Sequence, residues 1–197
     1  MAKEVHMKNS NDTKQKLIDV TRQMIDTSGV DSVSMRDLGK ETNLSRSAVY
    51  VYFKNKDDLL AAIVTENFDT LKNRISKLIG EINNPKKLVY EVLYAFYDFG
   101  IKNQEHYPLM FRKQWNKEQY PTLHISAIEV FALLYECLEK AHEQKCTVNK
   151  SPKQLTAMAS SFILGLVELN STGHLEPEKG LDDPTDLINS FVDVIFI

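Results

Sequence analysis

Helical periodicity runs through almost the whole chain, and it constrains the fold more than any other feature of the sequence. Apolar residues recur at intervals of three and four between turn residues, and no stretch alternates apolar and polar residues long enough for a strand. The seven glycines and six prolines fall mostly where helices are expected to end. The sequence therefore predicts an all-α protein.

Composition places the chain among ordinary globular proteins. It has 197 residues, of which 43% are hydrophobic and 26% are charged, so it is long enough to bury a core without disulfides. The net charge of -3 indicates neither a nucleic-acid nor a membrane partner. Cys137 and Cys146 form no metal-binding or disulfide pattern, and the polar N-terminus has no apolar signal run. We expect a soluble, cytoplasmic protein with no cofactor.

The length and the apolar content of the expected helices change along the chain. The first is expected to begin near Asn11 to Thr13 and to end at Gly29. Two short helices with tight turns follow it, and a long helix covers residues 56 to 79. Longer helices with many apolar residues follow, over about 86–102, 108–116, 122–144, 152–170 and 184 to the end. We predict two domains, residues 10–67 and 68–197.

The stretch LSRSAVYVYFKNKDD, residues 44 to 58, has an unusual composition for a surface helix. Ser34 and Ser45 are good N-caps for two short helices, and Asn43 between them tolerates the left-handed backbone of a tight turn. Val49 and Phe53 are expected to face inward. Two short helices joined by a tight turn and supported by a third form the helix-turn-helix pattern.

The first residues of the second helix in such a pair reach the base edges in the major groove. Arginine bonds guanine through two hydrogen bonds, serine bonds either edge, and an alanine methyl meets the methyl group of thymine. Tyrosine hydroxyls, a lysine and free helix-start amides suit phosphate oxygens. The candidates are Ser45, Arg46, Ser47 and Ala48 for bases, and Ser34, Arg36, Tyr50, Tyr52 and Lys56 for phosphates. One alternative is that Tyr50 or Tyr52 is a core residue. Another is that the chain is a helical interaction module without DNA binding, which needs no base-reading residues at this position.

The segment from Thr13 to Leu60 resembles the DNA-binding domain of TetR-family transcriptional regulators. The resemblance rests on Gly29 after the first helix, on SMRDLGKETNLS, and on AVYVYFKNKDDLL. Asn43 stands where glycine is commoner in the turn, and Gly39 stands where alanine is commoner in the second helix. Both residues are small or turn-tolerant, so the motif is loosened and not broken.

The resemblance implies an N-terminal three-helix helix-turn-helix domain and a larger C-terminal helical domain that binds a ligand and dimerises. A homodimer of this kind reads palindromic double-stranded DNA with its two recognition helices about 34 Å apart. Binding of a small-molecule effector changes that separation through the long helix at residues 56–79, and the DNA is released. The expected function is a ligand-responsive regulator, in most cases a repressor.

The last two helices carry more apolar surface than an exposed terminus needs. Two such helices from each of two chains are expected to form a four-helix dimer interface, with Phe162, Leu166, Phe191 and Ile195 as candidate interface residues. The alternative is that these residues bury themselves within one subunit.

The region between Leu88 and Tyr135 is rich in aromatic residues, and its segment HYPLMFRKQW is similar to one found in regulatory domains of this kind. A cavity lined by aromatic residues suits a small apolar or aromatic effector. The candidate ligand-binding residues are Tyr94, Phe111, Trp115 and His124. The alternative for each is a place in the core, which is the usual position of an aromatic residue at helical spacing.

No motif in the sequence indicates catalysis. The chain has no glycine-rich phosphate loop, no HExxH motif and no nucleophile elbow. The five histidines fall in different segments and no two of them have the spacing of metal ligands. We expect no enzyme, no metal site and no membrane partner.

Overall fold

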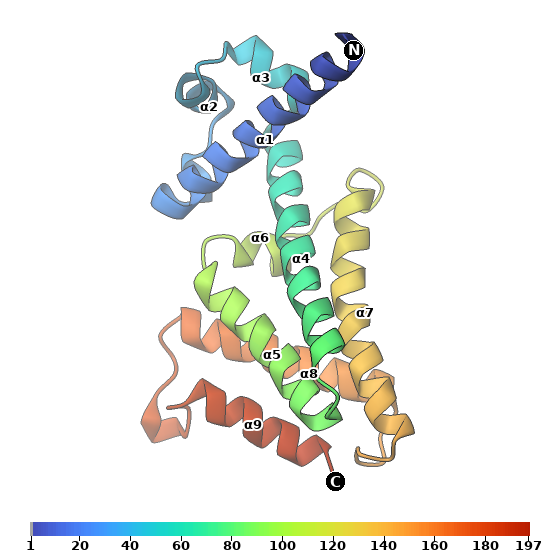
Figure 1. Cartoon of the computed structure of the whole chain (residues 1–197). Helices are drawn as coiled ribbons and strands as arrows, with labels where there is room; N and C mark the ends of the chain where they lie inside the picture. Colours follow the sequence, from blue (N-terminus) through green and yellow to red (C-terminus); the bar gives the residue numbers. More distant parts are fainter. Residues whose placement is uncertain (1) are drawn as a thin grey trace. The chain divides into compact units, whose positions relative to one another are not determined.

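A computed structural model of the chain describes the backbone from Ala2 to Ile197 and the side chains from Ser10 onward (Figure 1). Every regular element among these residues is helical, and the only extended pairing described is an isolated bridge between Thr147 and Phe196. The chain divides into two compact units. The first comprises the chain up to Asn67 together with Glu105–Leu123, and the second comprises Phe68–Gln104 and His124–Ile197.

The first unit begins with α1 (Ala2–Ser28), which passes through the short turn η1 (Val30–Ser32) to α2 (Met35–Thr42) and α3 (Arg46–Tyr52). The prediction that the first helix starts near Asn11 to Thr13 was wrong, because α1 begins at Ala2. Cap-type residues at 11–13 did not stop the helix, since the residues before them also favour helical backbone. Gly29 follows α1 with a φ of 75°, a backbone conformation that glycine adopts without strain.

The core of the first unit comes from one face of each of its helices. Leu17 and Ile25 on α1, Leu38 on α2 and Val49 on α3 are completely buried. They pack with the first half of α4 (Lys56–Glu81), which contributes the buried Leu59. This core holds α2 and α3 in fixed orientations, so the side chains on their outer faces are positioned by the packing of their inner faces.

The segment Glu105–Leu123 also packs in the first unit, although it lies far from α1 in the sequence. It contains α6 (Tyr107–Phe111) and the start of α7 (Pro121–Glu143). The Nε2 atom of buried His106 lies 2.9 Å from the Asp26 carboxylate on α1. Lys113 forms an ion pair of 2.6 Å with Asp57 at the start of α4. Our prediction assigned these residues to the second domain, because the helices become longer and more apolar after about Asn67.

The second unit is built on α5 (Pro85–Lys102), which packs against α8 (Pro152–Ser171) and α9 (Pro184–Ile195) (Figure 1). Each of these helices has proline in its first turn after a polar N-cap, as the sequence predicted for α8 and α9. Ser151 and Gln154 form a reciprocal capping box at the start of α8. These local signals fix where the three helices of this bundle begin.

Within the second unit, α7 is tied to the second half of α4 by polar contacts. Lys72 pairs with Glu129 at 2.9 Å, and the Ser126 hydroxyl donates a hydrogen bond to Asp69. In the described part of the chain, α7 is the one helix long and apolar enough to cross a bilayer. A single helix of this kind is weak evidence for a membrane span, because the core helix of a soluble protein meets the same criteria.

The structure corrects two of the four predicted dimer-interface residues. Leu166 and Ile195 are 3% and 0% exposed, so both belong to the core of a single chain and present no surface to a second one. Phe162 on α8 and Phe191 on α9 are half-buried and stack on one another, with ring centroids 4.4 Å apart. The apolar stripes of both helices are broad, and sequence periodicity alone did not separate their inner edge from their outer edge.

Candidate nucleic-acid interface

The turn between α2 and α3 is built from local interactions. The Ser34 hydroxyl accepts the Asp37 amide hydrogen at 3.1 Å and donates to the Asp37 carboxylate at 2.6 Å, which lowers the pKa of that carboxyl. Asn43 ends α2 with a φ of 58°, the left-handed conformation predicted for it. Gly39 lies against the turn, where a Cβ atom would stand 2.9 Å from the carbonyl oxygen of Leu44. Glycine at position 39 therefore allows the two helices to approach closely.

The orientation of α3 follows from its cap and its buried face. The Ser45 hydroxyl accepts the Ala48 amide hydrogen at 3.1 Å and starts the helix. Val49 is completely buried and Phe53 nearly so, as predicted. The opposite face of α3 is exposed. Its members are Arg46, Ser47, Tyr50 and Val51.

Arg46 and Tyr50 lie one helical turn apart and interact across the exposed face. The guanidinium carbon of Arg46 lies 5.6 Å from the centroid of the Tyr50 ring, and an Nη2 hydrogen points to the Tyr50 hydroxyl at a long 3.4 Å. A cation–π contact of this exposed kind is weak, so the guanidinium stays available to a ligand. The tyrosine ring holds the arginine side chain along the helix surface.

The two serines at the start of α3 have different surroundings. Ser45 is committed to capping the helix, and its oxygen also lies 2.9 Å from the Ser47 oxygen. Ser47 is exposed and extends from the first turn of α3. Of these two predicted base-contacting serines, Ser47 therefore has the hydroxyl that is better placed for an outside partner.

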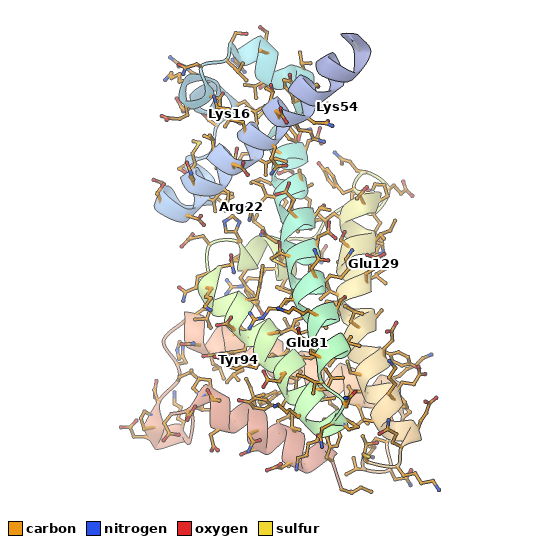
Figure 2. All side chains as sticks on the ribbon, in the orientation of Figure 1. Lys16, Arg22, Lys54, Glu81, Tyr94 and Glu129 are labelled. Atoms are coloured by element: carbon orange, nitrogen blue, oxygen red, sulfur yellow. The ribbon has the colours of Figure 1, made fainter. Side chains whose placement is uncertain are left out.

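The predicted phosphate site at Lys56 is occupied by an internal contact. The half-buried Lys56 ammonium donates a hydrogen bond of 2.6 Å to the carbonyl oxygen of Val30. The start of α4 is also capped, because the Asn55 side chain accepts the Asp58 amide hydrogen at 2.8 Å. Lys56 thus joins α4 to the turn that follows α1, and Lys54 is the exposed lysine of the pair (Figure 2).

Two exposed residues of this region were not among the sequence candidates. Lys54 follows Phe53, the C-cap of α3, and Val51 on α3 is 79% exposed. The signal for Val51 was present in the sequence, because a residue two positions from an inward-facing valine must face outward on a helix. Arg36 on α2 is exposed, as its predicted contact to DNA requires.

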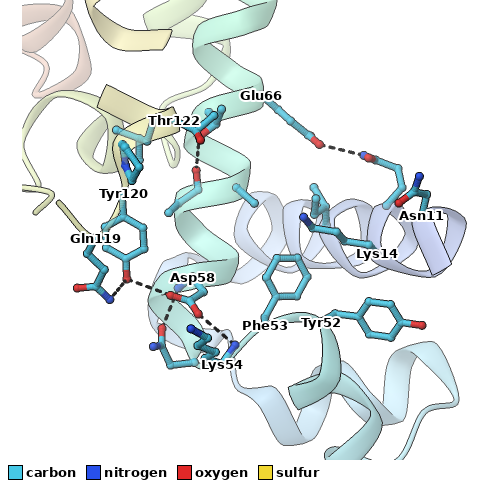
Figure 3. Close-up of a pocket in the computed structure, with 18 residues that line it drawn as sticks. Asn11, Lys14, Tyr52, Phe53, Lys54, Asp58, Glu66, Gln119, Tyr120 and Thr122 are labelled. Carbon is cyan, nitrogen blue, oxygen red and sulfur yellow. Dashed lines mark hydrogen bonds between the residues drawn. The ribbon is translucent and has the colours of Figure 1, made fainter. Parts of the chain in front are cut away.

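An open groove of about 650 Å³, lined in part by Lys54, lies on the first unit (Figure 3). Its walls come from α1, from the α3–α4 turn, from α4 and from residues 119–123. The Asp58 carboxylate accepts the Lys54 amide hydrogen at 3.1 Å and the Tyr120 hydroxyl at 3.3 Å, which joins the last of these segments to the turn. Half-buried Tyr52 lines the groove, and none of the four predicted ligand-binding residues does.

The four predicted ligand-binding residues are divided between the two units. Phe111 packs on the Tyr107 ring at 4.7 Å, and the Trp115 indole donates a hydrogen bond of 2.7 Å to the Leu109 carbonyl, both in the first unit. Tyr94 (labelled in Figure 2) and His124 belong to the second unit. On α5 the Tyr94 ring lies between those of Tyr90 and Tyr97, with ring centroids 6.3 Å and 6.4 Å away. A second groove, of about 520 Å³ next to Gly29, is not lined by any of the four either.

Comparisons with known proteins match both parts of the chain. Residues 17–63 match the family described as bacterial regulatory proteins, tetR family. Residues 89–195 match the tetracyclin repressor-like C-terminal domain, which is more than half of the chain. Among curated proteins, the chain is 31% identical over 86 residues to a nicotine-responsive HTH-type transcriptional repressor of Paenarthrobacter nicotinovorans; the match covers 44% of each chain.

Solved structures share the fold over almost the whole chain. A Rhodococcus sp. RHA1 protein of unknown function superposes with a TM-score of 0.81 at 17% identity, covering 94% of this chain and 96% of the other. The TetR-family regulator PfmR of Thermus thermophilus superposes with a TM-score of 0.68 at 17% identity, covering 91% and 96%. The likeness to these two structures concerns the fold alone.

Proposed function

We propose that this chain, which belongs to the TetR family of DNA-binding transcriptional regulators, is a cytoplasmic repressor. Binding of a small effector releases it from its DNA operator. In this proposal two chains form a homodimer, and each places one α3 helix in the major groove of a palindromic operator. Effector binding favours a different separation of the two α3 helices, and the operator is released. The family match and the curated relative point to a transcriptional regulator and not to an enzyme.

The observation that carries the proposal is the outer face of α3. This short helix is anchored by buried Val49 and exposes Arg46 and Ser47 at its N-terminal end. An arginine side chain can form two hydrogen bonds to guanine, and a serine hydroxyl can bond either edge of a base. Because the anchoring side and the exposed side are opposite one another, a duplex can approach α3 without disturbing the core.

Phosphate contacts are expected on both sides of α3. Arg36 on α2 and Lys54 after α3 are exposed cations, Tyr50 on α3 is exposed, and Tyr52 on α3 is half-buried. We assign Ser34 and Lys56 minor parts, because their polar groups already bind Asp37 and the Val30 carbonyl. Contacts to phosphate fix the position of the protein on the duplex and carry no sequence information.

The homodimer is proposed to form on the outer edge of α8 and α9. Phe162 and Phe191 stack there, and the neighbouring Met158 and Val194 are 45% and 71% exposed. Contiguous apolar surface of this kind is costly in water and is typical of an interface. Two further predicted residues, Leu166 and Ile195, support this edge from inside the chain.

The effector is proposed to be small and apolar or aromatic. The support is the number of aromatic side chains in both units, including Phe111, Trp115 and Tyr94, and the responsiveness to nicotine of one relative. Release requires only that the effector bind the DNA-free arrangement more tightly than the DNA-bound one. His124 and these aromatics remain the predicted contacts.

Selection of duplexes from random DNA by the purified full chain tests the proposal. We expect enrichment of a palindrome whose half-sites are one helical turn apart, and loss of binding when aromatic amines and phenols are screened against that duplex. No enrichment at low salt, from folded protein, would favour a helical interaction module in which Arg46→Ala changes no activity.

A further inference from the structure

Val51 is the most exposed large apolar residue among the described side chains of the first unit. Its exposed fraction is 79%, on a helix of only seven residues. Val49, two residues earlier, is completely buried. Two residues correspond to about 200° of rotation around an α-helix, so Val51 points almost directly away from the core.

The surroundings of Val51 are polar. Ser47 lies one turn before it on the same side of α3, the Arg46–Tyr50 pair lies beside it, and Lys54 follows it in the chain. A valine isolated among polar groups is not stabilised by contact with apolar side chains of its own chain. It does not form a patch large enough to bind another protein.

The surface that a DNA major groove presents has hydrogen-bonding groups at nearly every position and one apolar group, the C5 methyl of thymine. The exposed face of α3 has the complementary arrangement, with a single aliphatic side chain among hydrogen-bonding ones. Resting on the proposal that α3 enters the major groove, we infer that Val51 is a specificity-determining residue that contacts the methyl group of a thymine in each half-site.

The contact is expected one turn farther along α3 than the contacts of Ser47. Residues 47 and 51 are separated by about 6 Å along the helix axis. The thymine is therefore expected one or two base pairs from the base read by Ser47, on the side toward the C-terminal end of α3. A 5-methyl group is the only feature of the base that this contact uses.

Removal of single methyl groups from the DNA tests the inference. In the palindrome recovered by selection, each thymine is replaced in turn by deoxyuridine, which removes the C5 methyl and leaves every hydrogen-bonding group in place. For the full-length protein we expect one position per half-site at which this weakens binding about fourfold, the equivalent of burying one methyl group. Replacing both symmetric thymines should weaken binding on the order of 15-fold.

The same duplexes are then measured with Val51→Ala. This variant should bind the thymine duplex more weakly than the unmodified chain and should bind the thymine and uracil duplexes equally well. Alanine is the stronger helix former and position 51 is exposed, so the variant is expected to fold. Ile128→Ala, at a 53% exposed isoleucine on α7 in the second unit, is the matched control and should keep the full thymine preference.

Arg46→Ala in the same assay separates the inference from the function on which it rests. Weaker binding by Arg46→Ala, with a thymine preference that Val51→Ala abolishes, supports both. Weaker binding by Arg46→Ala with no thymine preference at any position, or with one that persists in Val51→Ala, overturns the role of Val51 alone. A chain that selects no duplex, or for which Arg46→Ala changes nothing, overturns the placement of α3 as well.

Discussion

Val51 on α3 and Val194 on α9 are the same side chain at nearly the same exposure, 79% and 71%, yet their surroundings differ. Val51 stands among serine, tyrosine and charged groups on the first unit. Val194 lies on the edge of α8 and α9 that carries stacked Phe162 and Phe191. The neighbours of each valine therefore indicate a different partner: the polar neighbours of Val51 suit the proposed DNA groove, and the apolar neighbours of Val194 suit the proposed second chain.

The largest effect is expected from breaking the apolar edge. Phe162→Glu places a charge against the Phe191 ring, and desolvating that charge in an interface is unfavourable. The variant should sediment as a monomer and bind the palindrome at least about 100-fold more weakly, because the two half-sites no longer act together. Ile128→Glu is the control at an exposed residue outside this edge. A Phe162→Glu variant that remains a dimer would show that the interface lies elsewhere.

The next effect concerns the polar face of α3. Arg46→Ala should cost about 1–3 kcal/mol of operator binding and relax the preference at one base per half-site. Lys54→Ala should weaken binding to all sequences about equally and lower the slope of affinity against salt concentration. Titrations at three salt concentrations on matched and mismatched duplexes distinguish the two. Equal behaviour of both variants on every duplex would contradict the assignment of Arg46 to base reading.

Lys56, in the first unit, is expected to contribute more to stability than to DNA binding. Because its ammonium donates to the Val30 carbonyl, Lys56→Met should lower the free energy of unfolding by about 1 kcal/mol, the usual loss for one hydrogen bond. Denaturant titration measures this change. An unchanged stability with a large loss of DNA affinity would restore Lys56 as a phosphate contact.

Gly39 lies in the tightly packed turn of the first unit, and Gly80 lies at an open position in the second. A Cβ atom on Gly39 would meet the Leu44 carbonyl oxygen at 2.9 Å, whereas one on Gly80 in α4 would meet nothing within 4 Å. Gly39→Ala should therefore destabilise the chain by about 1–3 kcal/mol despite the helix preference of alanine. Gly80→Ala should stabilise it by up to about 1 kcal/mol. Thermal unfolding of both variants measures the difference, and a stable Gly39→Ala variant would show that the turn can relax.

The smallest effect depends on pH. Burial lowers the pKa of His106, although the Asp26 carboxylate opposes this, so the unfolded chain binds a proton at higher pH than the folded chain does. Stability should fall as pH decreases below about 6.5, by about 1.4 kcal/mol for each unit of pKa depression at most. His106→Asn should be less stable at neutral pH but lose less on acidification. Parallel curves for both proteins between pH 7.5 and 5.5 would exclude this role.

The features predicted correctly from the sequence are those set by residues close to them in the chain. The caps at Ser34, Ser45, Ser151 and Asp183, and the left-handed Asn43, are each set by residues within four positions. The inward direction of Val49 followed from helical spacing in the same way. Local rules therefore recovered the helix-turn-helix and the orientation of α3.

What the sequence did not predict depends on contacts between distant residues. Lys56 binds a carbonyl 26 residues earlier, and His106 reaches an aspartate 80 residues earlier, so neither partner was visible in a local pattern. Leu166 and Ile195 are buried although they share their helices with exposed Met158 and Val194. On helices with apolar residues around much of their circumference, the packing of α5, α8 and α9 against one another determines which edge is inside.

Sedimentation of the full chain with duplexes that carry either the selected palindrome or one half-site tests whether two α3 helices read one operator from a dimer formed at α8 and α9. This arrangement predicts two chains on the palindrome. It also predicts affinity at least about 100-fold higher than for the single half-site. One chain per palindrome, or equal affinity for the two duplexes, would contradict it.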